Sequence, residues 1–240
     1  MRVTIAPVKN ITLLSQAGET LRSRAYGVPG IGLIWGRTGY GKTTAAVWFA
    51  NKIHAVHLRA NALWTPSALL RALMRELSAE PSSRLQDMLS FAVERLGQEK
   101  RPLIVDEADY LMSNKRLVET LRDIHDLSNV PLILIGMHDF RRKVATREQL
   151  AGRVAQWVEF KPADLEDART IADTVCQISV TDDLLEELHK SSSGSIRDMV
   201  VGLSRIEEIG KRHGKDKMTL KDWGKQAFTL ISDIGGTNGN

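Results

Sequence analysis

The sequence has a single cysteine and no apolar run long enough to cross a membrane. Cys176 cannot form a disulfide within the chain, and its place in a helical pattern favours a packed thiol over a reactive one. A bilayer span needs about 20 consecutive apolar residues. The stretch from Met1 to Leu14 lacks the charged-then-apolar order of a signal peptide. These absences predict a soluble protein of a reducing cytoplasm.

Internal repeats and low-complexity tracts are also missing, and 42% of the residues are apolar, which excludes broad disorder. Charge is uneven along the chain. Residues 1–160 carry 22 Lys and Arg against 15 Asp and Glu, whereas residues 161–240 carry 11 against 14. We expect two units with different partners. The basic first part fits either contact with nucleic-acid phosphates or a solvated surface.

One loop matches the pattern GxxxxGK[ST] at every fixed position. It consists of Gly36, Arg37, Thr38, Gly39, Tyr40, Gly41, Lys42 and Thr43. Between a strand and a helix, such a loop points successive backbone N–H groups and the positive helix end at one anion. Lys42 can reach the β- and γ-phosphates, and the Thr43 hydroxyl can bind Mg²⁺. We predict that ATP binds here with Mg²⁺, and that Thr44 adjoins it at the start of the next helix.

Strand-like and helix-like segments alternate as far as Pro162. Apolar runs between helical patterns predict an α/β fold with a parallel sheet that is covered on both faces. The expected strands are 31–35, 55–59, 102–106, 130–135 and 156–160. A helix is expected at 10–24 with Asn10 as its N-cap. The pattern after Pro162 is all-helical, at 165–175, 181–190, 195–212 and 220–230.

A carboxylate pair ends the third predicted strand. At the carboxyl edge of the sheet, Asp106 can hold Mg²⁺ through a water, and Glu107 can orient and deprotonate an attacking water. An acidic pair after a strand can also simply cap the following turn. Because a phosphate loop lies about 65 residues upstream, the pair predicts ATP hydrolysis as well as binding.

Together these motifs resemble those of the AAA+ ATPases. The resemblance implies an AAA+ core with a five-stranded parallel sheet, followed by a small all-helical lid, and subunits that complete one another's sites. The expected divisions are an arm and helix at 1–25, the nucleotide-binding core at 26–161, the lid at 162–230 and a flexible tail at 231–240. Arg197, in Gly194-Ser195-Ile196-Arg197, resembles the arginine with which the family's lid reaches the γ-phosphate.

An arginine finger is implied in the same way. Arg153, in Leu150-Ala151-Gly152-Arg153-Val154, resembles the finger that a subunit presents to its neighbour. Its rivals nearby are Arg141, Arg142 and Arg147. The family's first sensor, a polar residue at the tip of the fourth strand, is replaced by Met137. Either His138 substitutes for it or the sensor is missing. We therefore expect slow turnover that DNA or a partner stimulates.

Within this family, three segments resemble ATPases that accompany DNA transposases, namely the B protein of Mu-like phages and its TnsC and IstB relatives. The segments are 27–36, 64–67 and 131–136. The resemblance implies ATP-dependent helical filaments on duplex DNA that mark target sites and stimulate a transposase, in a bacterial host cytoplasm if the protein is phage-encoded. Only about 25 residues precede the core, so we expect the core itself to contact DNA.

The basic residues expected to contact DNA phosphates are Arg59, Arg71, Arg75, Lys115 and Arg116. Such contacts are sequence-tolerant and sensitive to salt. No structural metal is predicted beyond the Mg²⁺ that accompanies ATP. Two alternatives stay open. One is a replication-initiator or helicase-loader ATPase, and the other is a nucleotide-gated interaction protein with little turnover.

Overall fold

The computed structural model describes residues 1–228. It divides into two compact units. The sheet unit comprises Leu13–Arg37 and Lys42–Phe160, and the helical unit comprises Met1–Thr12, Thr38–Gly41 and Lys161–Asn240. By its contacts, the tip of the phosphate loop therefore belongs to the helical unit. Among the described residues, no helix has the length and apolar character that crossing a membrane requires.

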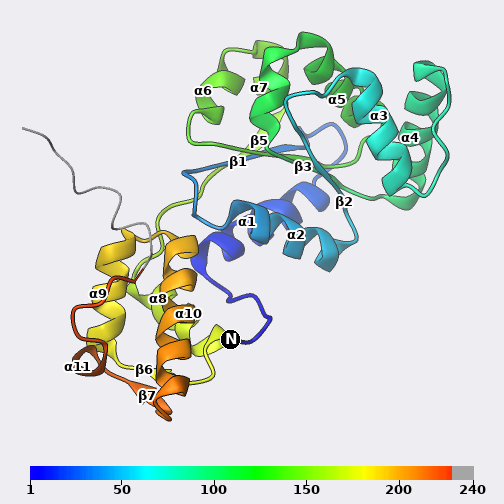
Figure 1. Cartoon of the computed structure of the whole chain (residues 1–240). Helices are drawn as coiled ribbons and strands as arrows, with labels where there is room; N and C mark the ends of the chain where they lie inside the picture. The colour runs from blue at the N-terminus through cyan, green and yellow to red at the C-terminus, as the bar shows by residue number, and fades with distance from the viewer. Residues whose placement is uncertain (229–240) are drawn as a thin grey trace, which may run out of the picture. The chain divides into compact units, whose positions relative to one another are not determined.

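The sheet unit is built on five parallel strands in the order β2-β3-β4-β1-β5 (Figure 1). The strands are β1 (Ile31–Trp35), β2 (Val56–Arg59), β3 (Leu103–Asp106), β4 (Leu132–Gly136) and β5 (Val154–Glu159). Every residue of β1, β3 and β4 is buried, as expected for central parallel strands with layers on both faces. The predicted α/β fold with a five-stranded parallel sheet is confirmed.

Helices cover both faces of this sheet (Figure 1). Helices α1 (Lys9–Arg22) and α2 (Lys42–Ile53) lie on one face. The other face carries α3 (Pro66–Glu76), α4 (Leu85–Glu99), α5 (Lys115–Ser128), α6 (Phe140–Ala145) and α7 (Glu148–Ala151). A short 3-10 helix, η1 (Ala108–Ser113), follows β3. Helix α1 packs closely on α2 at Gly18, where an added Cβ would lie 2.2 Å from the Phe49 ring.

The helical unit contains α8 (Leu165–Val175), α9 (Asp182–Ser192), α10 (Ile196–Arg212) and α11 (Leu220–Trp223). The expectation of an all-helical lid was wrong in one detail. Strands β6 (Ser179–Val180) and β7 (Lys217–Met218) pair in parallel beside the helices. Two-residue strands leave no periodic pattern in a sequence, because such a pattern needs about four residues.

Two other local predictions were wrong. The helix expected at 220–230 ends at Trp223, because Gly224 adopts a positive φ of 68° that stops helical geometry; residues 229–240, and with them the predicted tail, lie outside the described part. Asn10 is not an N-cap but lies inside α1. Its amide group donates to the Tyr40 and Lys161 carbonyls and accepts from the Lys161 N–H, all within the helical unit.

Candidate functional site

The phosphate loop joins β1 to α2, as the sequence predicts. Gly39 and Gly41 adopt φ values of 89° and 81°, a region that L side chains enter only with strain. Lys42 is the first residue of α2, and its Nζ donates to the carbonyls of Gly36 and Arg37 at 2.8 and 2.9 Å. The next two residues, Thr43 and Thr44, are exposed in the first turn. The loop thus places a lysine, hydroxyls and a helix N-terminus together, which suits a polyphosphate.

Asp106 ends β3 and is 2% exposed. Its Oδ1 accepts the Glu107 N–H at 2.9 Å, whereas its Oδ2 is buried and has no hydrogen-bond partner among the described residues. An unsatisfied buried carboxylate oxygen is costly unless something binds it. Oxygen ligands are what Mg²⁺ prefers. The Asp106 carboxylate therefore fits the role of holding nucleotide-bound Mg²⁺ through a water.

Glu107 has an unusual backbone. Its φ is 54° and its ψ is 36°. The other non-glycine residues with positive φ in the described chain each follow a helix end, where this conformation is common, but Glu107 follows a strand. Such strain costs about 1–3 kcal/mol and clusters at functional sites. The turn leaves the Glu107 side chain 30% exposed, so its carboxylate can meet a water.

Arg59 lies beside this carboxylate. It ends β2 and is paired in register with Asp106 on the neighbouring strand. Its Nη2 is 3.4 Å from Glu107 Oε1, and its side chain is 65% exposed. One arginine thus contacts the predicted catalytic carboxylate and remains accessible to a partner. The sequence had marked both residues but gave no indication that they touch.

The tip of β4 lies between these groups and the phosphate loop, because the strand order is β3-β4-β1. The Met137 N–H, just after β4, donates to Asp109 Oδ2 at 2.6 Å. His138 is 62% exposed and lies 3.3 Å from the Asp139 carboxylate. Asp109 was missed in the sequence, although the run Asp106-Glu107-Ala108-Asp109 contains it. No local pattern pointed to it, because its contact is with the backbone N–H of Met137, 28 residues further along the chain.

The candidate finger arginines lie at opposite edges of the sheet. Arg153 immediately precedes β5, at the amino edge, where its Nε donates to the Asp126 carboxylate at 2.8 and 3.0 Å. Arg141 and Arg142 begin α6, after the carboxyl end of β4. The Arg141 guanidinium lies 5.8 Å from the ring centroid of Trp35, the last residue of β1. Arg147 donates to the Met112 carbonyl.

Arg197 begins helix α10 of the helical unit. Ser195 caps this helix through a bond from the Asp198 N–H at 3.3 Å. The Arg197 N–H donates to the Gly39 carbonyl at 3.1 Å, and its side chain is exposed. Within this unit the start of α10 therefore holds the tip of the phosphate loop. An added Cβ on Gly39 would lie 2.4 Å from Ser195 Oγ, so this contact requires glycine.

All five predicted DNA-contact residues are exposed. They lie at the end of β2, on α3 and at the start of α5: Arg59, Arg71, Arg75, Lys115 and Arg116. Each of these side chains is therefore accessible to DNA, and their role in DNA contact stays a prediction. The single cysteine is buried at the end of α8, where burial raises the pKa of the Cys176 thiol to about 11. A thiol that stays protonated is a poor nucleophile.

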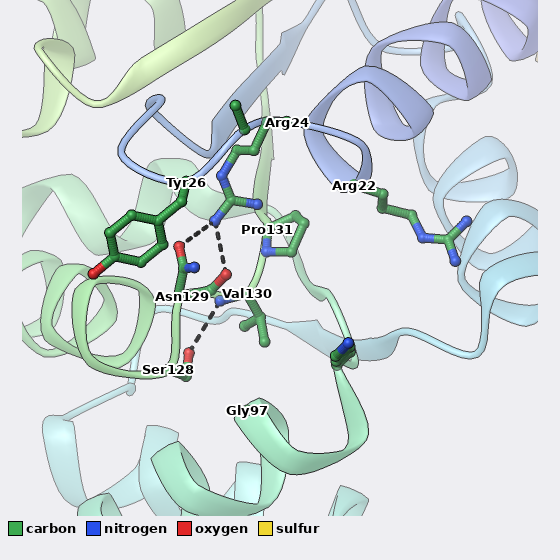
Figure 2. A pocket seen from close by; sticks show the side chains of 10 residues that line it. Arg22, Arg24, Tyr26, Gly97, Ser128, Asn129, Val130 and Pro131 are labelled. Atoms are coloured by element: carbon green, nitrogen blue, oxygen red, sulfur yellow. Dashed lines mark hydrogen bonds between the residues drawn. The ribbon is translucent and has the colours of Figure 1, made fainter.

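A cavity of about 430 Å³ lies at the amino edge of the sheet (Figure 2). Helices α1, α4 and α5 all end near it. Its positively charged lining residues are Arg22, Arg24 and Lys100. Arg24 donates to the carbonyls of Leu21 and Val28 and to both oxygens of Asn129. Cations stabilise helix C-termini, so the helix ends account for these charges without a ligand.

Residues 26–144 match the model of a protein family described as an AAA domain. A search of curated proteins found no significant match. Among solved structures, the chain is similar to the ORC2 protein of Aeropyrum pernix in ADPNP-ADP complexes. The TM-score is 0.65 at 17% identity, over 99% of this chain and 74% of that one.

Two further structures are similar. The Cdc6p protein of Pyrobaculum aerophilum matches with a TM-score of 0.64 at 16% identity, over 92% of this chain and 68% of that one. The ORC1 protein of Aeropyrum pernix, solved in complex with DNA, matches with a TM-score of 0.62 at 17% identity, over 90% and 63%. At these identities the similarity establishes the fold alone. The fold is that of an α/β P-loop ATPase.

Proposed function

We propose that this protein is an ATPase that assembles on duplex DNA in its ATP-bound state and whose hydrolysis is controlled by that DNA. The contact between Arg59 and Glu107 carries this proposal. It joins a residue suited to bind DNA phosphates to the residue suited to activate water. Binding and hydrolysis are then coupled through one side chain.

The phosphate loop and the carboxyl edge of the sheet supply the groups for hydrolysis. Lys42 and the loop amides bind the β- and γ-phosphates, and Thr43 and Asp106 hold the Mg²⁺. When bound by these residues, Mg²⁺ would neutralise charge on the phosphate oxygens. Glu107 orients a water and accepts its proton as the water attacks the γ-phosphorus. The bond from the γ-phosphorus to the bridging oxygen breaks, and ADP and phosphate result.

DNA affects hydrolysis through Arg59. The pair with Glu107 is exposed, so it is worth at most about 1 kcal/mol. A DNA phosphate competes well with such a weak partner. When Arg59 turns to DNA, Glu107 is released to bind water. The same energy limits the effect of the release to about fivefold in rate. Arg71, Arg75, Lys115 and Arg116 add sequence-tolerant contacts to the DNA backbone.

Assembly supplies the remaining groups. Arg153 lies at the sheet edge opposite its own phosphate loop, so it can act only in the site of a neighbouring subunit. There it neutralises charge in the transition state. Arg197 reports from the lid whether the γ-phosphate is present. Loss of that phosphate then loosens both lid and neighbour, and the assembly on DNA comes apart.

This proposal has two versions, which differ in the protein that the ATPase works with: a transposase or a replicative helicase. The segments 27–36, 64–67 and 131–136 favour a protein that marks DNA target sites for a transposase. A replication-initiator or helicase-loader role is favoured by the similarity in fold to ORC and Cdc6 proteins, one of them solved with DNA. We place the transposase role first, because it rests on this chain's own residues. Stimulation of turnover by a purified transposase or by a replicative helicase decides between them.

The experiment for the shared proposal is sedimentation of the protein with plasmid DNA. With a non-hydrolysable ATP analogue the wild type should pellet with DNA, and without nucleotide it should stay in the supernatant. Lys42→Ala should stay in the supernatant in both cases. Equal pelleting with and without the analogue would contradict the proposal, and absence of ATP turnover would leave only a nucleotide-gated binding protein.

A further inference from the structure

We infer that Asp109 is a positioning residue for hydrolysis, which holds the tip of β4 through its backbone at the position where Met137 replaces the expected polar sensor. The inference rests on the proposed ATPase function. It assigns the role of the first sensor to a residue in the turn after Glu107, whereas the sequence suggested only His138 for that role.

The tip of β4 is held from both sides. Asp109 Oδ2 accepts the Met137 N–H at 2.6 Å, and the Met137 carbonyl accepts the Phe140 N–H at 3.0 Å. The Asp109 side chain is only 14% exposed. A short hydrogen bond from an amide to a largely buried carboxylate is of the strong, charge-assisted kind. The peptide that follows β4 therefore has little freedom to rotate.

The packing around this tip is close. A Cβ added to Gly136 would lie 2.5 Å from Asp109 Oδ2 and 2.3 Å from the ring of Phe140, which is fully buried. Glycine at the end of β4 is what allows the carboxylate to approach the strand. The close approach and the hydrogen bond thus depend on each other.

Its position links this contact to the chemistry. Asp109 lies two residues after Glu107, in the short helix η1 that Glu107 immediately precedes. The tip of β4 lies between the end of β3 and the phosphate loop that follows β1. Asp109 therefore fixes the Glu107 turn against the strand that separates it from the phosphates. By contrast, His138 is mostly exposed and is near another carboxylate, that of Asp139.

A second partner of Asp109 provides the control. Lys143 Nζ of helix α6 lies 3.2 Å from Asp109 Oδ1, and both residues line a cavity of about 380 Å³. The Lys143 side chain is 48% exposed, so this ion pair contributes little. Lys143→Met removes the ion pair and leaves the bond to the Met137 N–H. Asp109→Leu keeps the branched shape of the side chain, although leucine is larger, and removes both interactions.

The experiment compares ATP turnover and amide hydrogen exchange at Met137 in wild type, Asp109→Leu, Asp109→Asn and Lys143→Met, all with duplex DNA present. We expect kcat to fall about tenfold or more in Asp109→Leu and about threefold in Asp109→Asn, since a neutral acceptor is roughly half as strong. Exchange at Met137 should become faster in the same order. KM for ATP should stay within about twofold, and Lys143→Met should match wild type.

Several results would overturn the inference. They are an unchanged kcat in Asp109→Leu, a loss that appears in KM in place of kcat, or an equal loss in Lys143→Met. Should Asp109→Leu fail to fold, Asp109→Asn decides, and unaltered Met137 exchange there refutes the positioning role. Failure of the proposed function looks different: the wild type itself then shows no turnover, while the exchange comparison still tests the contact.

Discussion

The two edges of the five-stranded sheet both contain charged residues, but these residues are hydrogen-bonded at one edge and incompletely bonded or strained at the other. At the amino edge, Arg24 has four oxygen acceptors and Arg153 has a carboxylate. At the carboxyl edge, Asp106 has an orphaned oxygen, Glu107 has a strained backbone and Arg59 has one long contact. Polar groups that are satisfied hold a fold together. Those that are left unsatisfied or strained are available for chemistry.

The largest effect should come from the one amino-edge residue that we assign to catalysis. Arg153→Ala should lower turnover about 10³–10⁵-fold, as expected for loss of a finger. Mixing it with Glu107→Gln should restore activity, since each protein supplies the group that the other lacks. The control is Asp126→Asn, which breaks the same ion pair but keeps the arginine, and should retain turnover. A mixture no more active than its parts would exclude a finger acting between subunits.

Glu107→Gln should lower turnover about 10²–10⁴-fold, the usual contribution of a general base. ATP affinity should remain, so assemblies on DNA should become long-lived, which electron microscopy can follow. Glu99 offers a matched control at the amino edge, because it is similarly exposed and also paired with arginine. Glu99→Gln should leave turnover unchanged; if it behaves as Glu107→Gln does, the two edges do not differ.

Substitution of one crowded glycine at each edge compares the two edges directly. A Cβ on Gly30 would lie 2.5 Å from Arg24 Nε, and one on Gly36 would lie 2.6 Å from the Phe160 carbonyl. Each alanine variant should lose about 1–3 kcal/mol of unfolding free energy, measured by urea titration. Only Gly36→Ala should also weaken nucleotide binding, measured with a fluorescent ATP analogue. Equally weakened nucleotide binding in Gly30→Ala would contradict the assignment of nucleotide binding to the carboxyl edge alone.

The smallest effect should lie in the helical unit, at Glu207. Burial alone would raise the pKa of Glu207. Hydrogen bonds from Lys211, the N-terminal ammonium and the Gln177 N–H more than offset this and lower its pKa to about 2, from 4.5. The resulting stability, about 1–2 kcal/mol, is present above about pH 4.5 and lost as the pH falls towards 2.

Glu207→Gln should therefore melt at a lower temperature than wild type at pH 7, and the gap should shrink by pH 3. Turnover per folded molecule should not change. A gap that stays constant with pH would mean that the ion pairs are not the source of the stability.

The sequence predicted what depends on local pattern. The apolar runs identified all five strands. Fixed spacing gave Lys42, Asp106 and Glu107 as candidate site residues. Helices α6 and α7, the 3-10 helix η1 and the β6–β7 pair are too short to leave a periodic pattern. The roles of Asn10, Arg59 and Asp109 depend on contacts with residues far along the chain. Such contacts follow from strand order, which no local pattern contains.

The most direct test of the account is ATP turnover with and without duplex DNA in wild type and in Arg59→Gln. Both proteins are assayed at a concentration at which ATP alone drives assembly, so that the neighbouring subunit's arginine is in place with and without DNA. Under these conditions the account predicts about fivefold stimulation by DNA in wild type, which rising salt abolishes. Arg59→Gln should turn over at the stimulated rate without DNA and gain nothing when DNA is added. If DNA stimulates the variant as strongly as the wild type, the contact between Arg59 and Glu107 does not couple DNA to hydrolysis.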